Sequence, residues 1–168
     1  MSKRVDILPL LDKALSAFPA KFDTPEARVL LIAIGLQESR LKHRYQIVAG
    51  KPGAKGPARG LWQFERMGGT AGVLGFHSIE NLTAYCVSAA GLPASDPRTV
   101  WEALEHDDVL AARFARLLLW TDPRSLPKRG DATAGWNYYI RVWRPGKPHL
   151  STWGAFWREA EAQVYGTP

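Results

Sequence analysis

Apolar residues recur at steps of three and four along most of the chain, which is the period of an amphipathic helix. Thr24 can cap a helix that has Pro25 at its first position, and Pro123 ends another. A short helix is expected at 61–65, and the run KPGAKGP within residues 45–59 predicts an irregular loop. No segment alternates like a long strand, so we expect a mainly α-helical single domain over residues 1–168 with little or no β structure. The longer predicted helices span residues 5–18, 25–41, 79–90, 98–105, 109–120, 133–142 and 151–164.

One carboxylate interrupts the apolar face of the helix predicted over residues 25–41. Leu31, Ile34 and Leu41 belong to that face, and Glu38 lies at helical steps from each of them. Burial disfavours the ionised form of a carboxyl group and raises its pKa. A carboxylic acid that keeps its proton near neutral pH is the donor that the oxygen of a glycosidic bond needs. Pairing of Glu38 with a basic neighbour such as Arg40 is the alternative interpretation.

Two later segments combine small residues, aromatic rings and side-chain amides. Residues 60–64 read Gly-Leu-Trp-Gln-Phe, and residues 134–139 read Ala-Gly-Trp-Asn-Tyr-Tyr. Glycine allows close backbone approach to a ligand, tryptophan offers a flat face that stacks on sugars, and an amide both donates and accepts hydrogen bonds. Each segment alone also fits an ordinary core or turn. Together with Glu38 they supply an acid, a polar group and aromatic walls.

The succession of Glu38-Ser39, then Gly60-Leu61-Trp62-Gln63, then Trp136-Asn137 resembles the lytic transglycosylases of the soluble-transglycosylase type. Members of that family carry a Glu-Ser pair, a Gly-Leu-Met-Gln turn and an Ala-Tyr-Asn segment, and the likeness covers about residues 25–142. The resemblance implies one lysozyme-like catalytic domain. It also implies cleavage of the β-1,4 bond between N-acetylmuramic acid and N-acetylglucosamine in peptidoglycan.

The resemblance assigns roles to single residues. Glu38 would protonate the leaving oxygen and then take the proton of the muramic C6 hydroxyl, which closes on C1 to give a 1,6-anhydro product. Ser39 would position the region of Glu38, Gln63 would hold the acetamido group, and Asn137 would line the opposite wall. Neither a cofactor nor a metal is expected. The candidate substrate-binding residues are Ser39, Gly60, Trp62, Gln63, Phe64, Trp136, Asn137 and Tyr138.

The chain departs from the family pattern at two aromatic positions. Trp62 replaces the family's methionine, and Trp136 replaces a tyrosine whose hydroxyl reaches the catalytic glutamate. Tyr138 or Tyr139 is the candidate substitute for that hydroxyl. Without such a substitute, Glu38 lacks an orienting partner.

A hydrolysing lysozyme needs a second carboxylate across the scissile bond. No aspartate or glutamate lies between Glu38 and Glu65, so Glu65 and Asp131 are the candidates, each with a solvated surface charge as the alternative. The missing partner favours a transglycosylase with a single acid. A muramidase and a non-catalytic, glycan-binding phage structural protein remain the alternatives.

The net charge of +6 predicts an anionic partner. The basic and aromatic run at residues 136–147 also fits a nucleic-acid strand, but no recognition motif accompanies it, so peptidoglycan glycan strands are preferred and nucleic acid is not expected. The segment 143–157, which contains the run RPGKPH, is a candidate for an additional glycan wall, although packing of a terminal helix also explains Trp153 and Trp157.

The N-terminal sequence lacks the pattern of a signal peptide, and no stretch reaches the ~20 apolar residues of a membrane span. We therefore expect a monomer, made in the host cytoplasm without stable membrane insertion, that acts on the periplasmic cell wall. These expectations are typical of a phage or prophage endolysin. Such a protein would reach the wall with a holin as its partner for export, or it would be carried in the virion.

Overall fold

Eight α-helices and one three-stranded sheet make up residues 2–167, the part of the chain that this computed structural model describes. A π-helical turn at Arg66–Thr70 (η2) leads into α3. The mainly α-helical class with little β structure is confirmed. The helices are α1 (Ile7–Leu15), α2 (Pro25–Ser39), α3 (Ala71–Leu74), α4 (Glu80–Ala89), α5 (Pro97–Leu104), α6 (Asp108–Trp120), α7 (Ala132–Trp143) and α8 (Leu150–Tyr165). The strands are β1 (Tyr45–Ile47), β2 (Lys55–Arg59) and β3 (Phe64–Glu65).

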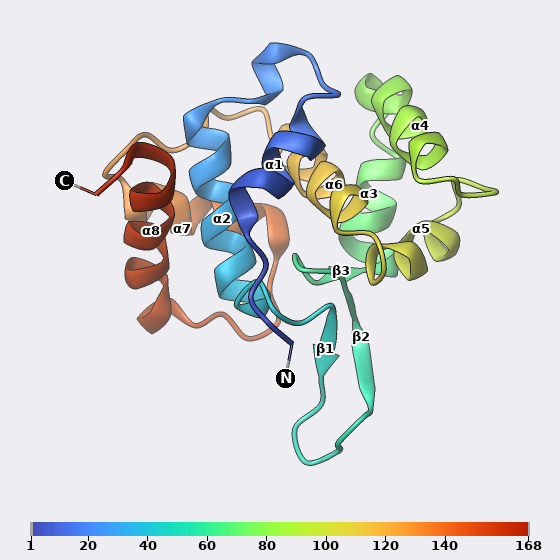
Figure 1. Cartoon of the computed structure of the whole chain (residues 1–168), viewed down its shortest axis with the longest axis horizontal. Helices are drawn as coiled ribbons and strands as arrows, with labels where there is room; N and C mark the ends of the chain where they lie inside the picture. The colour runs from blue at the N-terminus through green and yellow to red at the C-terminus, as the bar shows by residue number, and fades with distance from the viewer. Residues whose placement is uncertain (1, 168) are drawn as a thin grey trace.

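Helix α2 is the central element of the fold because it is apolar on every side. Buried residues follow one another without interruption from Val29 to Leu36, and a helix that is hydrophobic all round must be covered all round. Thr24 caps its start by accepting a hydrogen bond from the Ala27 backbone N–H (3.2 Å). Figure 1 shows α2 in the middle of the molecule, with α8 on one side and α1 and α6 on the other. No helix within residues 2–167 has both the length and the apolar character needed to cross a membrane.

The seven longer predicted helices are all present, with bounds within three residues of those predicted. Helix α2 ends two residues earlier than predicted, because Arg40 (φ 59°) and Leu41 (φ 54°) adopt the left-handed conformation. Two local predictions are wrong. Residues 61–65 form a tight turn and strand β3 instead of a short helix, and residues 45–59 contain β1 and β2 instead of an irregular loop.

The segment rich in glycine and proline forms an antiparallel hairpin, because side chains supplement the few backbone hydrogen bonds between its two strands. Tyr45 of β1 pairs with Arg59 of β2, and an irregularity follows further along the hairpin. Gln46 Oε1 accepts a hydrogen bond from the Ala58 N–H (3.3 Å) and so replaces a backbone acceptor. A Cβ on Gly56 would lie 2.6 Å from the same oxygen, so a larger residue here would displace the Gln46 side chain from this bond. The hairpin extends beyond the helices (Figure 1).

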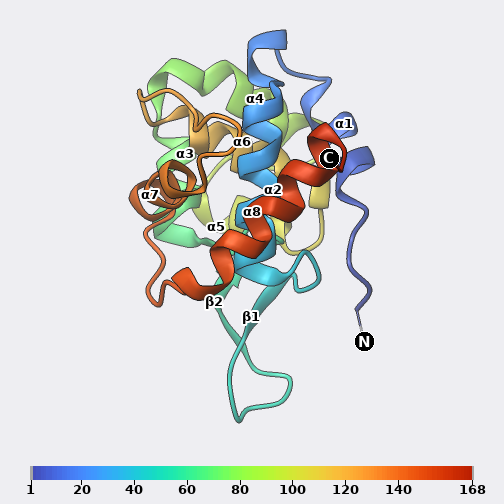
Figure 2. The ribbon, with the colours of Figure 1, turned by 90° about the vertical axis from the view of Figure 1, so that its left-hand side faces the viewer.

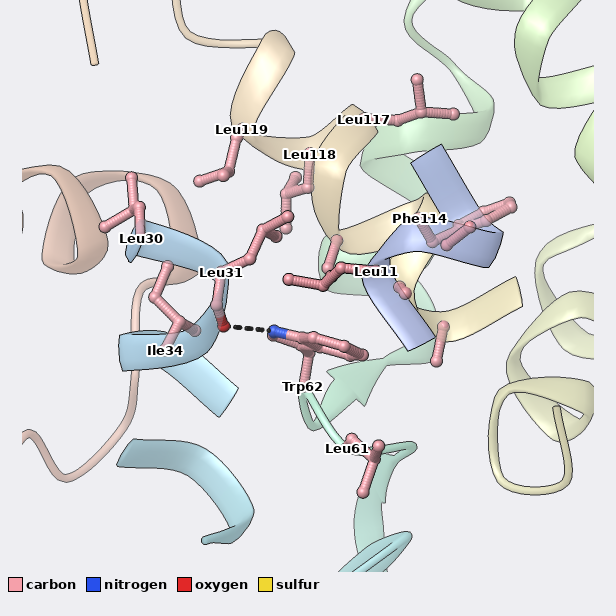
Figure 3. Packing of buried hydrophobic residues seen from close by; sticks show 14 of the residues in the cluster. Leu11, Leu30, Leu31, Ile34, Leu61, Trp62, Phe114, Leu117, Leu118 and Leu119 are labelled. Carbon is pink, nitrogen blue, oxygen red and sulfur yellow. Dashed lines mark hydrogen bonds between the residues drawn. The ribbon is translucent and has the colours of Figure 1, made fainter. Parts of the chain in front are cut away.

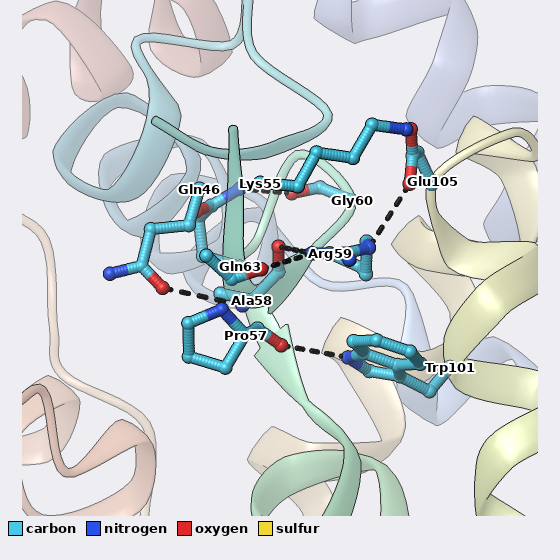
Figure 4. A network of polar contacts seen from close by, with 10 residues as sticks. Gln46, Lys55, Pro57, Ala58, Arg59, Gly60, Gln63, Trp101 and Glu105 are labelled. Carbon is cyan, nitrogen blue, oxygen red and sulfur yellow. Dashed lines mark hydrogen bonds and ion pairs between the residues drawn. The ribbon is translucent and has the colours of Figure 1, made fainter. Parts of the chain in front are cut away.

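The base of the hairpin is fastened to the end of α5 (Figure 4). Arg59 Nε lies 3.0 Å from a carboxylate oxygen of Glu105, and Lys55 pairs with the other oxygen. Trp101 Nε1 donates a hydrogen bond to the Pro57 carbonyl (3.0 Å). Strand β2 is therefore attached to α5 by both side-chain and backbone groups, and this fixes the start of the turn that follows it.

Trp62, in the turn between β2 and β3, is buried in the centre of the core with an exposed fraction of 0%. Its Nε1 donates a hydrogen bond to the Leu31 carbonyl of α2 (2.8 Å), as Figure 3 shows, and its own carbonyl accepts one from Trp143 Nε1 of α7 (2.9 Å). Gly35 makes this approach possible, since a Cβ there would lie 3.3 Å from Trp62 Nε1 and 2.4 Å from Leu41 Cδ2. The expectation that Trp62 stacks on a sugar is therefore wrong, because protein covers both faces of its ring.

Replacing Trp62 with phenylalanine should lower the free energy of unfolding by roughly 2–3 kcal/mol, because the change leaves a cavity and a buried carbonyl without its donor. Chemical denaturation followed by circular dichroism measures the loss. Trp101→Phe is the matched control: its hydrogen bond lies near the surface, where water can replace the indole, so a loss below about 1 kcal/mol is expected. Equal losses in the two variants would contradict the central role of Trp62.

Candidate active site

A cleft of about 1030 Å³ opens beside the C-terminal end of α2. Its walls come from the end of α2, strands β2 and β3, the turn η2, the end of α6, helix α7 and the loop 144–149 between α7 and α8. Figure 2 shows α3 and α7 on the same side of α2. Segments that lie about a hundred residues apart in the chain therefore meet around one concave surface.

Glu38, in the last turn of α2, lies at the wall of this cleft. Burial raises the pKa of its carboxyl group to about 7, and the negative charge of Glu65 adds to the rise. Tyr139 Oη donates a hydrogen bond to Glu38 Oε1, which favours the ionised form and limits the rise in pKa. Arg40 is not its partner, because the Arg40 guanidinium donates to the carbonyls of Leu36 and Gln37. Near neutral pH, Glu38 therefore exists in both protonated and ionised forms.

Tyr139 is held in place by an aromatic stack between α7 and α8. Its ring lies parallel to that of Trp153, with centroids 5.3 Å apart and an interplanar angle of 7°. Trp153 Nε1 is anchored to the Ala132 carbonyl (2.8 Å). Burial and the neighbouring Glu38 carboxylate raise the pKa of Tyr139, so its hydroxyl stays a neutral donor. Of the two candidates Tyr138 and Tyr139, the structure brings Tyr139 to Glu38, whereas the hydroxyl of Tyr138 donates to the Leu119 carbonyl (2.7 Å) in the core.

Ser39 and Gly60 support the site from behind, and neither lines the cleft. Ser39 is 4% exposed, and its Oγ donates to the Leu61 carbonyl (2.6 Å), which ties the end of α2 to the turn at residues 60–63. Gly60 adopts φ +76°, and a Cβ there would lie 2.8 Å from the Leu104 carbonyl oxygen. The expectation of substrate contact at these two positions is wrong. Both residues bring backbone segments together, and Gly60 makes its close approach to α5 and not to a ligand.

Gln63 and Phe64 do line the cleft, as predicted. Gln63 has a left-handed backbone (φ 52°), and its Nε2 donates to the Gly60 carbonyl (2.9 Å) across the turn. Phe64 is buried beneath the cleft surface, with its ring edge-on to that of Trp143. Gln63 thus presents an amide group at the wall, and Phe64 forms an apolar floor.

The segment around Trp136 contributes through packing instead of through contact with the cleft. Trp136 lies against the rings of Tyr139 and Trp153, which buttresses the tyrosine. Asn137 is exposed and is not among the residues that line the cleft. The expectation that Trp136, Asn137 and Tyr138 line the cleft is wrong, and Tyr139 is the residue of this segment that does.

Of the two candidates for a second carboxylate, the cleft contains only Glu65. Asp131 caps α7 by accepting a hydrogen bond from the Ala134 N–H (2.9 Å) and lies outside the cleft. A third acid, Asp122, was not predicted. It lines the cleft but is paired with Arg141 (2.7 Å), which holds its pKa below the usual range.

Sequence reasoning missed Gln46 of the hairpin, which lines the cleft. Arg144 and Lys147 line it from the loop at residues 144–149, within the run RPGKPH that was a candidate for an additional glycan wall. Nothing in the sequence indicated that the hairpin would reach the cleft.

Comparisons of the chain with protein-family models, with curated proteins and with solved structures found no match. Within residues 2–167, no three His, Cys, Asp or Glu side chains gather in a way that would hold a metal ion.

The buried position of Glu38 predicts a specific dependence of stability on pH. The carboxyl group has a pKa of about 7 when folded, against 4.5 for an unperturbed glutamate, so the folded state binds its proton more tightly. The contribution of Glu38 to stability is therefore most favourable below pH 4.5 and is lost as the pH rises through 7, by up to roughly 3 kcal/mol. Glu38→Gln cannot ionise, so urea denaturation at about pH 5 and about pH 8 should show a smaller loss for the variant than for the wild type. Identical losses would mean that Glu38 is hydrated when folded.

Proposed function

We propose that this protein is a lytic transglycosylase that cleaves the β-1,4 bond between N-acetylmuramic acid and N-acetylglucosamine in peptidoglycan. The observation that carries the proposal is the state of Glu38, which is desolvated, has a pKa near 7 and accepts a hydrogen bond from a neutral tyrosine at the wall of an open cleft. A general acid is most effective when its pKa lies near the working pH. The cleft volume lies at the upper end of the range for ligand sites, about 300–1,000 Å³, as an extended glycan requires.

In the proposed reaction, Glu38 acts first as acid and then as base. Its protonated carboxyl group gives a proton to the glycosidic oxygen, the bond from that oxygen to the muramic C1 breaks, and N-acetylglucosamine leaves with a free hydroxyl group. The C6 hydroxyl of the muramic residue then bonds to C1 and gives its proton to the Glu38 carboxylate. The acid is restored and water is not consumed. The hydrogen bond from Tyr139 stabilises the carboxylate formed between the two steps.

Two features of the cleft support a single-acid mechanism. Asp122 is already neutralised by Arg141, so it is a poor candidate for a second acid or base. Glu65 is exposed on β3 and is not shielded from water as Glu38 is. In this proposal the partner is a peptidoglycan strand, and the protein works as a phage or prophage endolysin that reaches the wall with a holin or as part of a virion.

Hydrolysis is the second candidate, and one observation favours it. Glu65 lines the same cleft as Glu38, and its charge raises the pKa of Glu38, so the two carboxylates are electrostatically coupled. A carboxylate across the bond from the acid can activate a water molecule, which gives a muramidase.

The products released from purified peptidoglycan distinguish the candidates. Mass spectrometry of soluble muropeptides should find 1,6-anhydro ends with the wild type and none with Glu38→Gln, because general acid catalysis contributes about 10²–10⁴ in rate. Reducing ends that disappear in Glu65→Gln would establish hydrolysis instead. Absence of release by the wild type from several wall types would overturn both enzymatic proposals and leave a glycan-binding protein.

The pH dependence of the cleavage rate tests the roles of the two neighbours of Glu38. The wild-type rate should fall above a pH of about 7, as Glu38 loses its proton. Tyr139→Phe removes a bond that favours the carboxylate, so the fall should move to higher pH while the maximal rate drops roughly ten- to hundredfold. Glu65→Gln removes a negative charge and should move the fall to lower pH. Shifts in the opposite directions would contradict the assignment of Glu38 as the titrating acid.

A further inference from the structure

Two cations at one edge of the cleft have no carboxylate partner. Arg144 and Lys147 belong to the loop at residues 144–149. Within residues 2–167, no carboxylate oxygen lies within 4 Å of a side-chain nitrogen of either residue. Arg141, one turn earlier on α7, differs because it is paired with Asp122 at 2.7 Å. The cleft therefore has one edge whose positive charge is not neutralised by neighbours within residues 2–167.

This loop is fixed relative to the catalytic glutamate. At its beginning, Trp143 Nε1 donates to the Trp62 carbonyl (2.9 Å), next to Gln63. At its end, Gln37 Nε2, from the residue before Glu38, donates to the His149 carbonyl (2.8 Å). Prolines at residues 145 and 148 restrict the backbone between these anchors. A cation on such a loop needs little ordering when it binds a ligand.

The conformation of Arg144 gives an independent reason to look for a ligand. Arg144 ends α7 with φ 50° and ψ 53°, the left-handed conformation that helices usually assign to glycine. For a residue with a Cβ, the left-handed conformation costs about 1–2 kcal/mol relative to its preferred conformations. Strain of this kind is concentrated at functional sites. Of the other non-glycine residues with positive φ, Gln63 lines the same cleft, whereas Leu41 and Arg40, which ends α2 in the same conformation, do not.

We infer that Arg144 and Lys147 bind a carboxylate of the peptide stem that the muramic residue carries. The inference rests on the proposed function and identifies the part of the substrate that the cleft recognises beside the glycan. N-acetylglucosamine is uncharged, and the lactyl carboxyl group of N-acetylmuramic acid is taken up in the amide bond to the stem. The carboxylates of this part of the substrate therefore belong to the stem, and guanidinium and ammonium groups are the usual partners of such anions. Glu38 lies at a different wall of the cleft and is partly protonated at neutral pH, so it does not exclude the anion.

The double variant Arg144→Gly/Lys147→Ala tests the inference on two substrates. One is intact peptidoglycan, and the other is the same peptidoglycan after carbodiimide and ammonia have converted its stem carboxylates to neutral amides. The wild type should prefer the first through a lower KM. In the double variant, kcat/KM on the first substrate should fall roughly ten- to hundredfold more than on the second, as expected for the loss of one or two charged hydrogen bonds. Arg158→Ala and Lys128→Ala, which remove exposed cations outside the cleft, should leave both values unchanged.

Folding of the double variant is not at risk at Arg144, because glycine tolerates the left-handed conformation better than arginine does. An equal change of kcat/KM on both substrates, or none, would overturn the inference. A difference that disappears when phosphate-containing wall polymers are stripped from the peptidoglycan would also overturn it and assign the cations to those polymers.

A binding experiment separates this inference from the proposed function. Co-sedimentation with insoluble peptidoglycan, with Glu38→Gln present in every protein to prevent cleavage, reports affinity alone. Weaker sedimentation of the protein with the added Arg144→Gly and Lys147→Ala changes, seen with intact stems and not with amidated stems, would support the inference even if the wild type proves inactive. An equal change with intact and amidated stems, or no change, would overturn it even if the wild type cleaves glycan.

Discussion

The indole of Trp62 connects the three elements that carry the site. The indole N–H donates to a carbonyl of α2, and the backbone carbonyl of Trp62 accepts a hydrogen bond from Trp143 of α7. The next residue, Gln63, lines the cleft. A tryptophan buried at 0% exposure with its N–H satisfied contributes both apolar area and a directional constraint. Glu38 lies on α2 and Tyr139 on α7, so this connection and the packing of α2 and α7 against α8 together place the tyrosine beside the acid. The residue that looked like a sugar platform instead helps to hold the wall that carries Glu38.

The acid itself opposes folding, and the surrounding packing offsets its cost. Burial of a carboxyl group disfavours its ionised form, which is why the pKa of Glu38 lies near 7. The protein tolerates this because α2 is covered along its whole length, and because α7 lies very close to α8. Gly135 allows that close packing, since a Cβ there would lie 2.2 Å from the Trp157 ring. The same packing places Tyr139 on Trp153 and aims its hydroxyl at the acid.

The charged residues around the cleft are divided among its walls. Glu38 and Glu65 come from α2 and β3, Asp122 and Arg141 neutralise each other, and Arg144 lies on the loop beyond α7. The proposed function takes a glycan with anionic peptide stems as the partner and not a nucleic-acid strand, because a phosphate at every nucleotide would also meet the carboxylates. The net charge of +6 by itself did not distinguish the two.

Local sequence was sufficient for what depends on neighbours along the chain. Helical periodicity and caps such as Thr24 and Pro25 located the helices, and the position of Glu38 on an apolar face predicted its burial and raised pKa. Strand pairing was not predictable, since the hairpin depends on Gln46 and on the contacts of Arg59 with Glu105, which no periodicity encodes. Tertiary structure alone decided between Tyr138 and Tyr139, because adjacent helical positions point about 100° apart and only packing against α8 selects the one that meets the acid. It alone assigned Trp62 to the core and brought Arg144 to the cleft, because both outcomes depend on contacts between residues far apart in the chain.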